Sequence, residues 1–235
     1  IFAAAMLSLA DPPQAEAELA RVLDAGARIV CLRAAPIRTA SGGRSPGAPE
    51  FARFWSMLDE AGITVGYHSG DSGYGRYADD WGARGDMEAF RFDPFRSLVT
   101  TGRSMLETIG ALVIHGVFAA HPHLRVATIE NGSAWVPELF RRFRKFYKQV
   151  PEAFPGDPIE TFRRHVWVAP FYEDDIRALA DMIGIDHVLF GYDWPHAEGL
   201  AEPAAFVDDL DGFDADEVRT IMRDNGRALV EEAKP

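Results

Sequence analysis

The sequence predicts an α/β fold in which short parallel strands alternate with helices. Three times a helical stretch ends at a glycine and an apolar run follows at once, in DAGARIVCLR, EAGITVGYH and MIGIDHVLFGYD. Several apolar runs are rich in β-branched residues and lack polar alternation, which is typical of buried parallel strands. Repeated β-α units favour a (β/α)8 TIM barrel, with a doubly wound open sheet as the alternative.

Six strands and four helices follow from this pattern in chain order. The expected strands are Ile1–Leu9, Ala27–Leu32, Ile63–Tyr67, Leu124–Ile129, Val166–Ala169 and His187–Tyr192. The expected helices are Pro13–Ala25, Pro49–Ala61, Glu173–Ile183 and Asp214–Glu232. Glycine follows each of the first three helices, which is a common helix end. A barrel needs two more strands, and we expect them before residue 1, so that residues 1–235 form one domain with the C-terminal six β-α units.

Two long segments interrupt the alternation. Arg38–Pro49 is rich in Gly, Ser and Pro, and Ser69–Pro94 is rich in Gly, Asp, Tyr and Trp. Both come after strands, on the side where barrels carry their active sites, and we expect both to be long loops with a functional role. No glycine-rich nucleotide-binding signature is present to favour the open sheet.

Composition excludes several classes of partner. The 235 residues include 24 Lys and Arg and 36 Asp and Glu, for a net charge of −12. Binding to nucleic acid or to an anionic membrane surface needs basic residues, so we expect neither partner. The single cysteine, Cys31, cannot form an intramolecular disulfide, and the opening residues lack the features of a signal peptide. We therefore expect a cytoplasmic protein that acts on a small molecule.

Ionisable residues follow four of the predicted strands directly. They are Arg33 after VCL, His68 after ITVGY, Glu130 after RVATI and Asp193 after HVLFGY. In a barrel, the C-terminal ends of the strands meet at one mouth, which is where catalytic residues lie. The sequence therefore predicts that these four side chains converge.

Three of these residues, and His196 nearby, each have a functional and a structural interpretation. His68 is interpreted as a metal ligand or a general base, or else as a hydrogen-bonded core histidine. Asp193 would ligate a metal or take a proton from water, unless it only caps a turn. Glu130 would be a ligand, a general base or an ion-pair partner of Arg33, and a structural salt bridge is an equal alternative. His196 would line the mouth or lie in an exposed loop.

Other chemically suggestive residues are better explained by structure. His121 and His123 precede a predicted strand, so they belong at the N-terminal face of the barrel, where residues serve stability. Cys31 lies inside a strand, where a buried inert thiol is expected. The segment Leu139–Tyr147 places Phe140, Phe143 and Tyr147 on one helical face, which indicates buried aromatic residues with the basic residues in solvent.

Five segments together resemble the amidohydrolase-related family, in the branch that includes nonoxidative decarboxylases of the aminocarboxymuconate-semialdehyde and resorcylate type. The segments are LADPPQAEAELARVLDAGARIVCLR, AGITVGYHSGDSGY, FAAHPHLRVATIENGSAWVPEL, IDHVLFGYDWPHAEG and MRDNGRALV. The strongest is GYDWPHAEG, which is similar to a family element that carries a last-strand aspartate. The order and spacing of the segments extend the resemblance over nearly the whole chain.

The resemblance implies a distorted (β/α)8 barrel with a divalent metal, most often zinc, at its C-terminal mouth. It places His68 as the mid-barrel histidine ligand and Asp193 as the last-strand aspartate that binds the metal or activates its water. It also implies a His-x-His or Glu-x-His ligand pair, which we expect upstream of residue 1. Glu130 stands where many members carry a catalytic histidine, and a homodimer is also implied.

Three hypotheses for function follow. The first is a metal-dependent enzyme that acts on a small carboxylated or cyclic organic substrate by hydrolysis or nonoxidative decarboxylation. The second is a catalytically inactive barrel that acts as a binding or scaffold protein, and the third is a metal-free acid–base enzyme that uses His68, Glu130 and Asp193. For the first, the candidate substrate-binding residues are Arg33, Tyr74, Trp194 and His196.

Overall fold

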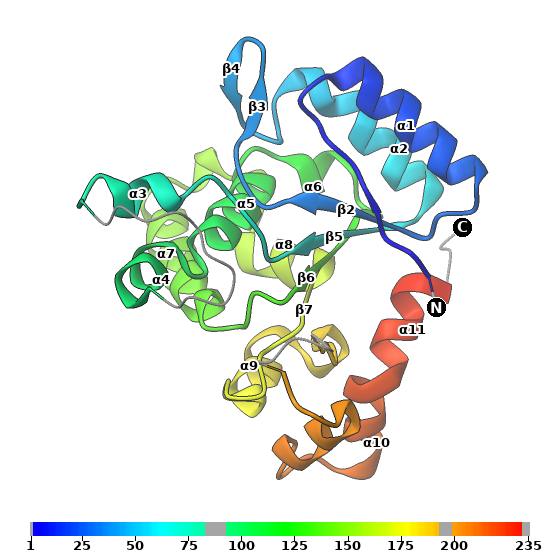
Figure 1. The fold of residues 1–235 in the computed structure, drawn as a ribbon, viewed down its shortest axis with the longest axis vertical. Helices are drawn as coiled ribbons and strands as arrows, with labels where there is room; N and C mark the ends of the chain where they lie inside the picture. The colour runs from blue at the N-terminus through cyan, green and yellow to red at the C-terminus, as the bar shows by residue number, and fades with distance from the viewer. Residues whose placement is uncertain (1, 83–92, 193–198, 232–235) are drawn as a thin grey trace.

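The structure is a computed structural model that describes residues 2–82, 93–192 and 199–231 (Figure 1). Its centre is a parallel sheet of five strands in the order β1-β2-β5-β6-β7. Helices lie around this sheet, as the repeated β-α units predict. The strands are β1 (Ala5–Met6), β2 (Ile29–Arg33), β5 (Thr64–His68), β6 (Arg125–Ile129) and β7 (Val166–Val168).

The sixth predicted strand, His187–Tyr192, forms only the start of a strand. Val188 makes a single parallel bridge to Val168, and the Leu189 amide donates to the Val168 carbonyl at 2.9 Å. The Phe190 amide donates instead to the carbonyl of Ile221, at 3.1 Å. The segment therefore extends the sheet beside β7 at one residue pair. The next amide along the chain, that of Phe190, bonds to Ile221 of the C-terminal helical segment instead.

The predicted helices form, and their ends have clear causes. Asp11 caps α1 (Pro12–Asp24) by accepting the Gln14 amide at 3.2 Å, and two prolines follow the cap. Gly62, at a φ of +62°, ends α2 (Ala52–Ala61) in the left-handed conformation that glycine adopts readily. In Figure 1, α1 and α2 lie side by side. Further helices are α5 (Arg103–Ile114), α6 (Val117–Ala120), α7 (Trp135–Gln149), α8 (Pro158–His165) and α9 (Ile176–Ile183).

The long C-terminal helix predicted at Asp214–Glu232 is interrupted. It consists of α10 (Ala215–Arg219), a π-helical turn η5 (Thr220–Asp224) and α11 (Asn225–Glu231). The Asn225 side chain donates to the carbonyls of Ile185 and Val188 at 2.8 and 2.7 Å, which joins the start of α11 to the segment beside β7. No helix in the described ranges has both the length and the apolar character needed to cross a membrane.

The segment Arg38–Pro49 is not the irregular loop that its composition predicts. Strands β3 (Ile37–Thr39) and β4 (Gly42–Arg44) pair antiparallel in a hairpin. Gly42 takes a φ of +103°, and the Thr39 hydroxyl donates to its carbonyl at 3.0 Å. Glycine here permits the tight reversal, so a residue that the composition assigns to a loop belongs to a strand.

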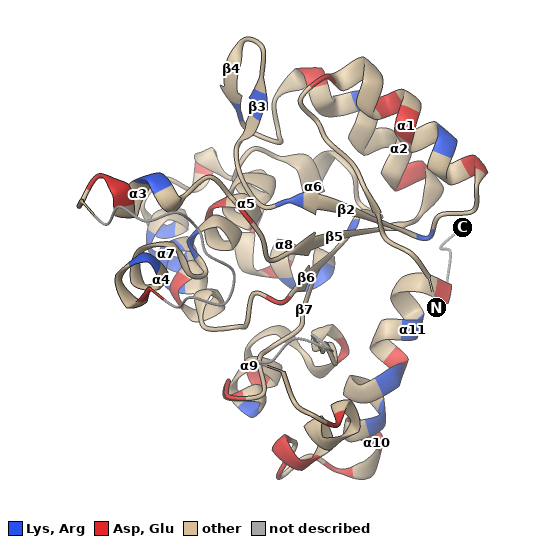
Figure 2. Ribbon diagram, viewed as in Figure 1, with Lys and Arg blue, Asp and Glu red and all other residues tan. Residues whose placement is uncertain are grey.

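The interpretation of the segment Leu139–Tyr147 is confirmed for Phe140 and Phe143, whereas Tyr147 is only partly buried. Phe140 and Phe143 of α7 are buried, and Phe140 packs edge-on against Phe162 of α8 with the ring centroids 4.9 Å apart. Arg141 and Arg142 are turned to solvent, where both contact Glu138. Figure 2 shows acidic and basic residues spread over the outer helices, with the central strands mostly uncharged.

At its N-terminal edge the sheet holds the end of α11. The Nη1 of Arg125 donates to the Ala228 carbonyl at 2.9 Å, the Thr64 hydroxyl to Leu229 at 2.7 Å, and the Nη1 of Arg28 to Val230 at 3.0 Å. The last carbonyls of a helix have no partner within the helix, and its C-terminus carries partial negative charge. The first residues of the strands therefore cap the final helix.

Arg125 is the buried arginine of this group, and its Nη2 also donates to the Gly62 carbonyl. We expect Arg125→Met to lower the free energy of unfolding by about 2–3 kcal/mol, because buried charge-assisted hydrogen bonds are lost. Arg28→Met is the matched control, since Arg28 is exposed and makes one such bond, and it should cost less than about 1 kcal/mol. Urea denaturation measures both, and equal losses would contradict the argument.

Candidate active site

Strand register brings three predicted site residues to one edge of the sheet. Arg33 is paired with His68 across β2 and β5, and His68 with Ile129 across β5 and β6. Glu130 follows Ile129 directly, so its side chain leaves the sheet beside His68. The strand ends of Arg33, His68 and Glu130 therefore lie at one edge of the sheet, but the predicted convergence of side chains is observed only for His68 and Glu130.

Three predicted site residues cannot be placed in this way. Asp193, Trp194 and His196 lie outside the described residues. Their assignment as ligand, catalytic or substrate-binding residues stays a prediction from the sequence.

His68 and Glu130 are in direct contact. The Nε2 of His68 lies 2.8 Å from Oε2 of Glu130, and the Nδ1 lies 2.7 Å from the carbonyl oxygen of Ser69. A carbonyl oxygen only accepts hydrogen bonds, so Nδ1 carries a proton and Nε2 is the nitrogen presented to the carboxylate. The side chain of His68 is 48% exposed and that of Glu130 is 23% exposed. The pair is thus partly shielded and still reachable by a small molecule.

The backbone of Glu130 is strained. Its φ is +55°, and within the described ranges it is the one non-glycine residue with a positive φ. The Asn131 side chain holds the turn by donating to the Ile129 and Tyr67 carbonyls at 2.7 and 3.2 Å. Strain of this kind persists where surrounding contacts fix it, and it gathers at functional sites. Here it directs the carboxylate toward His68.

Two cavities meet at the His68–Glu130 pair. The larger has a volume of about 1170 Å³ and the smaller about 300 Å³. Both are lined by His68, Ser69, Glu130 and Phe171. The pair is therefore placed to act on a molecule that occupies either cavity or both.

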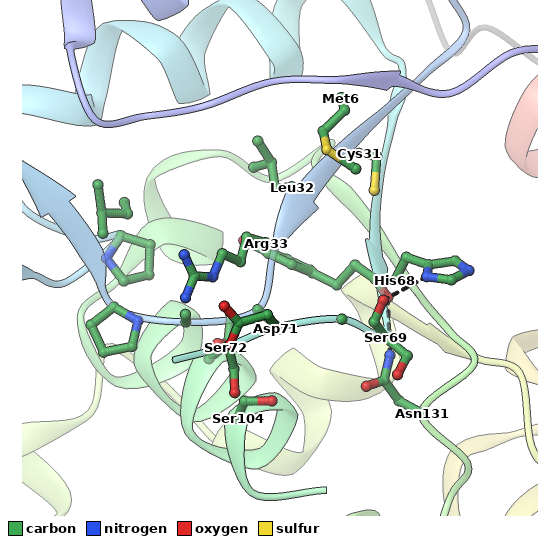
Figure 3. A pocket seen from close by; sticks show the side chains of 18 of the residues that line it. Met6, Cys31, Leu32, Arg33, His68, Ser69, Asp71, Ser72, Ser104 and Asn131 are labelled. Atoms are coloured by element: carbon green, nitrogen blue, oxygen red, sulfur yellow. Dashed lines mark hydrogen bonds between the residues drawn. The ribbon is translucent and has the colours of Figure 1, made fainter. Parts of the chain in front are cut away.

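The two cavities differ in character. The larger, drawn in Figure 3, is lined by Arg33 and Ser72 and by apolar residues such as Leu32. Tyr67 also lines it, and burial raises the pKa of this phenol, which keeps it neutral. The smaller cavity is mainly apolar. Its apolar and aromatic lining includes Ala169, Pro170, Phe171, Tyr172, Leu200 and Phe206.

Tyr74, predicted as a substrate contact, has other contacts in the structure. It is buried, its hydroxyl donates to Glu107 of α5, and its ring lies edge-on to Tyr77 with the centroids 5.2 Å apart. Burial, then Glu107, raises the pKa of Tyr74. Tyr74 lines neither of the two cavities and instead joins α3 (Gly75–Asp79) to α5.

Phe171 and Tyr172 are aromatic residues at a strand end that line a cavity, and the sequence analysis missed them. They come shortly after β7, in the segment APFYED. The strand-end rule that found His68 and Glu130 would have found them, had it been applied to apolar residues as well as ionisable ones.

The donors at the pair suit a divalent metal in type. An imidazole nitrogen and a carboxylate oxygen are ligands that zinc and manganese accept. Among the residues that the structure describes, no group of three or more His, Cys, Asp or Glu side chains forms a metal site. The described part of the chain thus contributes two suitable donors, and a complete ligand set needs further residues.

His121 and His123 lie at the opposite end of the sheet, as predicted. They precede Leu124 and β6, and the backbone amide of His123 donates to Asp59 at 2.7 Å. Burial lowers the pKa of His121, which favours the neutral ring. Neither lines the two cavities, so the prediction that these histidines stand apart from the site is confirmed.

Comparison with known proteins agrees with this architecture. The amidohydrolase family matches residues 1–231. A solved amidohydrolase from Mycobacterium avium subsp. paratuberculosis K-10 is 43% identical, with a TM-score of 0.91 over 97% of this chain and 57% of that one. The chain thus spans little more than half the length of that protein.

More distant structures share the fold. The 2,6-dihydroxybenzoate decarboxylase from Rhizobium is 20% identical, with a TM-score of 0.73 over 98% of this chain and 71% of its own. A dihydroxybenzoic acid decarboxylase from Polaromonas sp. JS666, solved with bound manganese and 2-nitroresorcinol, is 18% identical, with a TM-score of 0.72 over 100% of this chain and 69% of its own. The predicted barrel class is confirmed.

The strain at Glu130 can be measured with two variants that both remove the carboxylate. Glu130→Gly should unfold with a free energy about 1 kcal/mol higher than Glu130→Ala, because glycine adopts a positive φ without the steric cost that a Cβ brings. Chemical denaturation of the two variants gives the difference. Equal stability, or a more stable alanine variant, would show that the turn is not strained.

Proposed function

Because the chain belongs to the amidohydrolase family, we propose that it forms the catalytic part of a metal-dependent enzyme. The proposed substrates are small carboxylated or cyclic organic molecules, and the reaction is hydrolysis or nonoxidative decarboxylation. The observation that carries the proposal is the His68–Glu130 contact at the strand ends, where two cavities meet.

In this proposal, His68 and Asp193 hold a divalent ion. The ion would replace the contact of the His68 Nε2 with Glu130, because Nδ1 is held by the Ser69 carbonyl. The sequence resemblance favours zinc, and the manganese in the Polaromonas structure makes manganese the second choice. Such an ion supplies a Lewis acid that polarises a substrate oxygen.

Glu130 is proposed to move the proton. For hydrolysis, its carboxylate takes a proton from the attacking water and passes it to the leaving group. For decarboxylation, protonated Glu130 gives its proton to the carbon that keeps the electron pair of the broken C–C bond as carbon dioxide leaves. Its partial burial and its turn-fixed backbone suit either role, since a positioned group transfers a proton more effectively than a mobile one.

The cavities are proposed to bind the substrate on either side of this group. The apolar walls at Phe171, Tyr172 and Phe206 suit a ring or a short hydrocarbon chain. Arg33, at the edge of the larger cavity, suits an anionic group.

A metal-free acid–base enzyme is the second candidate, because the direct contact of imidazole and carboxylate is also what such a pair needs. Metal content separates the two candidates. We expect the full-length protein to hold about one equivalent of divalent metal per chain by elemental analysis, and its His68→Ala variant to lose most of it, since a site with one ligand fewer binds weakly.

His123→Ala is the matched control for that measurement. It removes an exposed histidine at the other end of the sheet, so its metal content should equal that of the parent. A parent without metal that still turns over a hydroxybenzoate or a lactone would favour the metal-free enzyme. A parent with neither metal nor turnover would favour a binding or scaffold protein.

A further inference from the structure

Two arginines converge on one glycine at the wall of the larger cavity. A Cβ placed on Gly73 would lie 3.0 Å from Nη2 of Arg33 and 3.7 Å from Nη2 of Arg38. Both guanidinium groups therefore lie within a few ångströms of the same point. Arg33 ends β2, and Arg38 is the middle residue of β3, so the unpredicted hairpin is what brings the second charge to the first.

No acidic side chain in the described part of the chain forms an ion pair with either arginine. Neither guanidinium has a carboxylate oxygen within 4.0 Å among those residues. Arg44, on the other strand of the same hairpin, is different, because it pairs with Glu50 at 3.2 Å. Asp71 lines the cavity nearby, and its Oδ1 accepts the Gly73 amide at 2.7 Å.

Both arginines line the larger cavity together with His68 and Glu130, at some remove from the pair. Arg33 and His68 are register partners on neighbouring strands. In Figure 3 the guanidinium of Arg33 points toward Asp71 and Ser72, while the imidazole of His68 points the other way. The two positive groups therefore form a separate end of the same cavity.

We propose that Arg33 and Arg38 form a subsite for a carboxylate of the substrate that is not the reacting group. Two like charges held together without an ion-pair partner repel one another, and an anion between them lowers that cost. The planar guanidinium matches the geometry of a carboxylate, which accepts two parallel hydrogen bonds. The subsite deepens the proposed function and rests on it, because it makes the substrate an anion anchored away from the atom that reacts.

Calorimetric titration with benzoate tests the subsite directly. We expect the parent to bind benzoate, and we expect Arg33→Gln and Arg38→Gln each to weaken binding about tenfold or more, since each removes a charge-assisted contact. Arg38→Lys keeps the charge and loses the planar fork, so its affinity should fall between those of the parent and Arg38→Gln.

Two controls locate the effect. Arg44→Gln makes the same charge change on the same hairpin at a residue that does not line the cavity, so it should leave the affinity unchanged. His68→Gln should change the affinity by less than about threefold, because a single contact away from the carboxylate contributes little. Titration of metal-loaded and chelator-treated protein separates benzoate bound at the arginines from benzoate bound to a metal ion, so failure of the subsite and failure of the proposed enzyme are distinguishable.

Each other result would overturn the proposal. Absence of benzoate binding by the parent would show that the two arginines are only solvated surface charges. Loss of binding in Arg33→Gln alone would show that Arg38 takes no part. Loss in His68→Gln would place the carboxylate at the reaction centre, and tighter binding of inorganic phosphate than of benzoate would assign the subsite to a different anion.

Discussion

The in-register pairing of parallel strands β2, β5 and β6 is the constraint on which the site depends. Thr64 is paired with both Ile29 and Arg125, and the pairing holds residue by residue to Arg33, His68 and Ile129. Side chains alternate between the two faces of a strand, so a slip of one residue would turn His68 away from Glu130. The contact between them is thus a consequence of register, which the buried β-branched residues of the strands enforce.

Residues at the starts of these strands stabilise the fold, and residues at their ends line the cavities. At the starts, Arg28, Thr64 and Arg125 use their donors on the carbonyls of α11, so polar side chains there hold the fold together. At the ends, Arg33 and Glu130 face cavities. This division explains why position along a strand separated His68 from His121, although residue type alone could not.

How far the sequence could predict this protein follows from what each feature depends on. The strands, the early helices and the residues at strand ends were predictable, because they follow from local periodicity and from the geometry of parallel sheets. The β3–β4 hairpin was not, because the glycines that permit it also mark loops. The contact of Tyr74 with Glu107 was not predictable, since Glu107 is 33 residues away and belongs to a helix that the pattern did not predict. The positive φ of Glu130 results from contacts of Asn131 with two strands, which no local signal shows.

At Glu130 the backbone conformation and the side chain call for different residue types. The positive φ favours glycine, whereas the contact with His68 needs a carboxylate. Glycine would adopt the left-handed conformation of residue 130 at a lower cost in free energy, as Gly132 does two residues later. Asparagine would also adopt it more readily than glutamate does. A glutamate there costs stability, and its carboxylate makes its contact on the side of the cavities, with His68. The carboxylate adds nothing to the packing of the apolar core around β6. The strain is therefore offset by the position of the carboxylate where the two cavities meet, since there it can reach a molecule that extends into both.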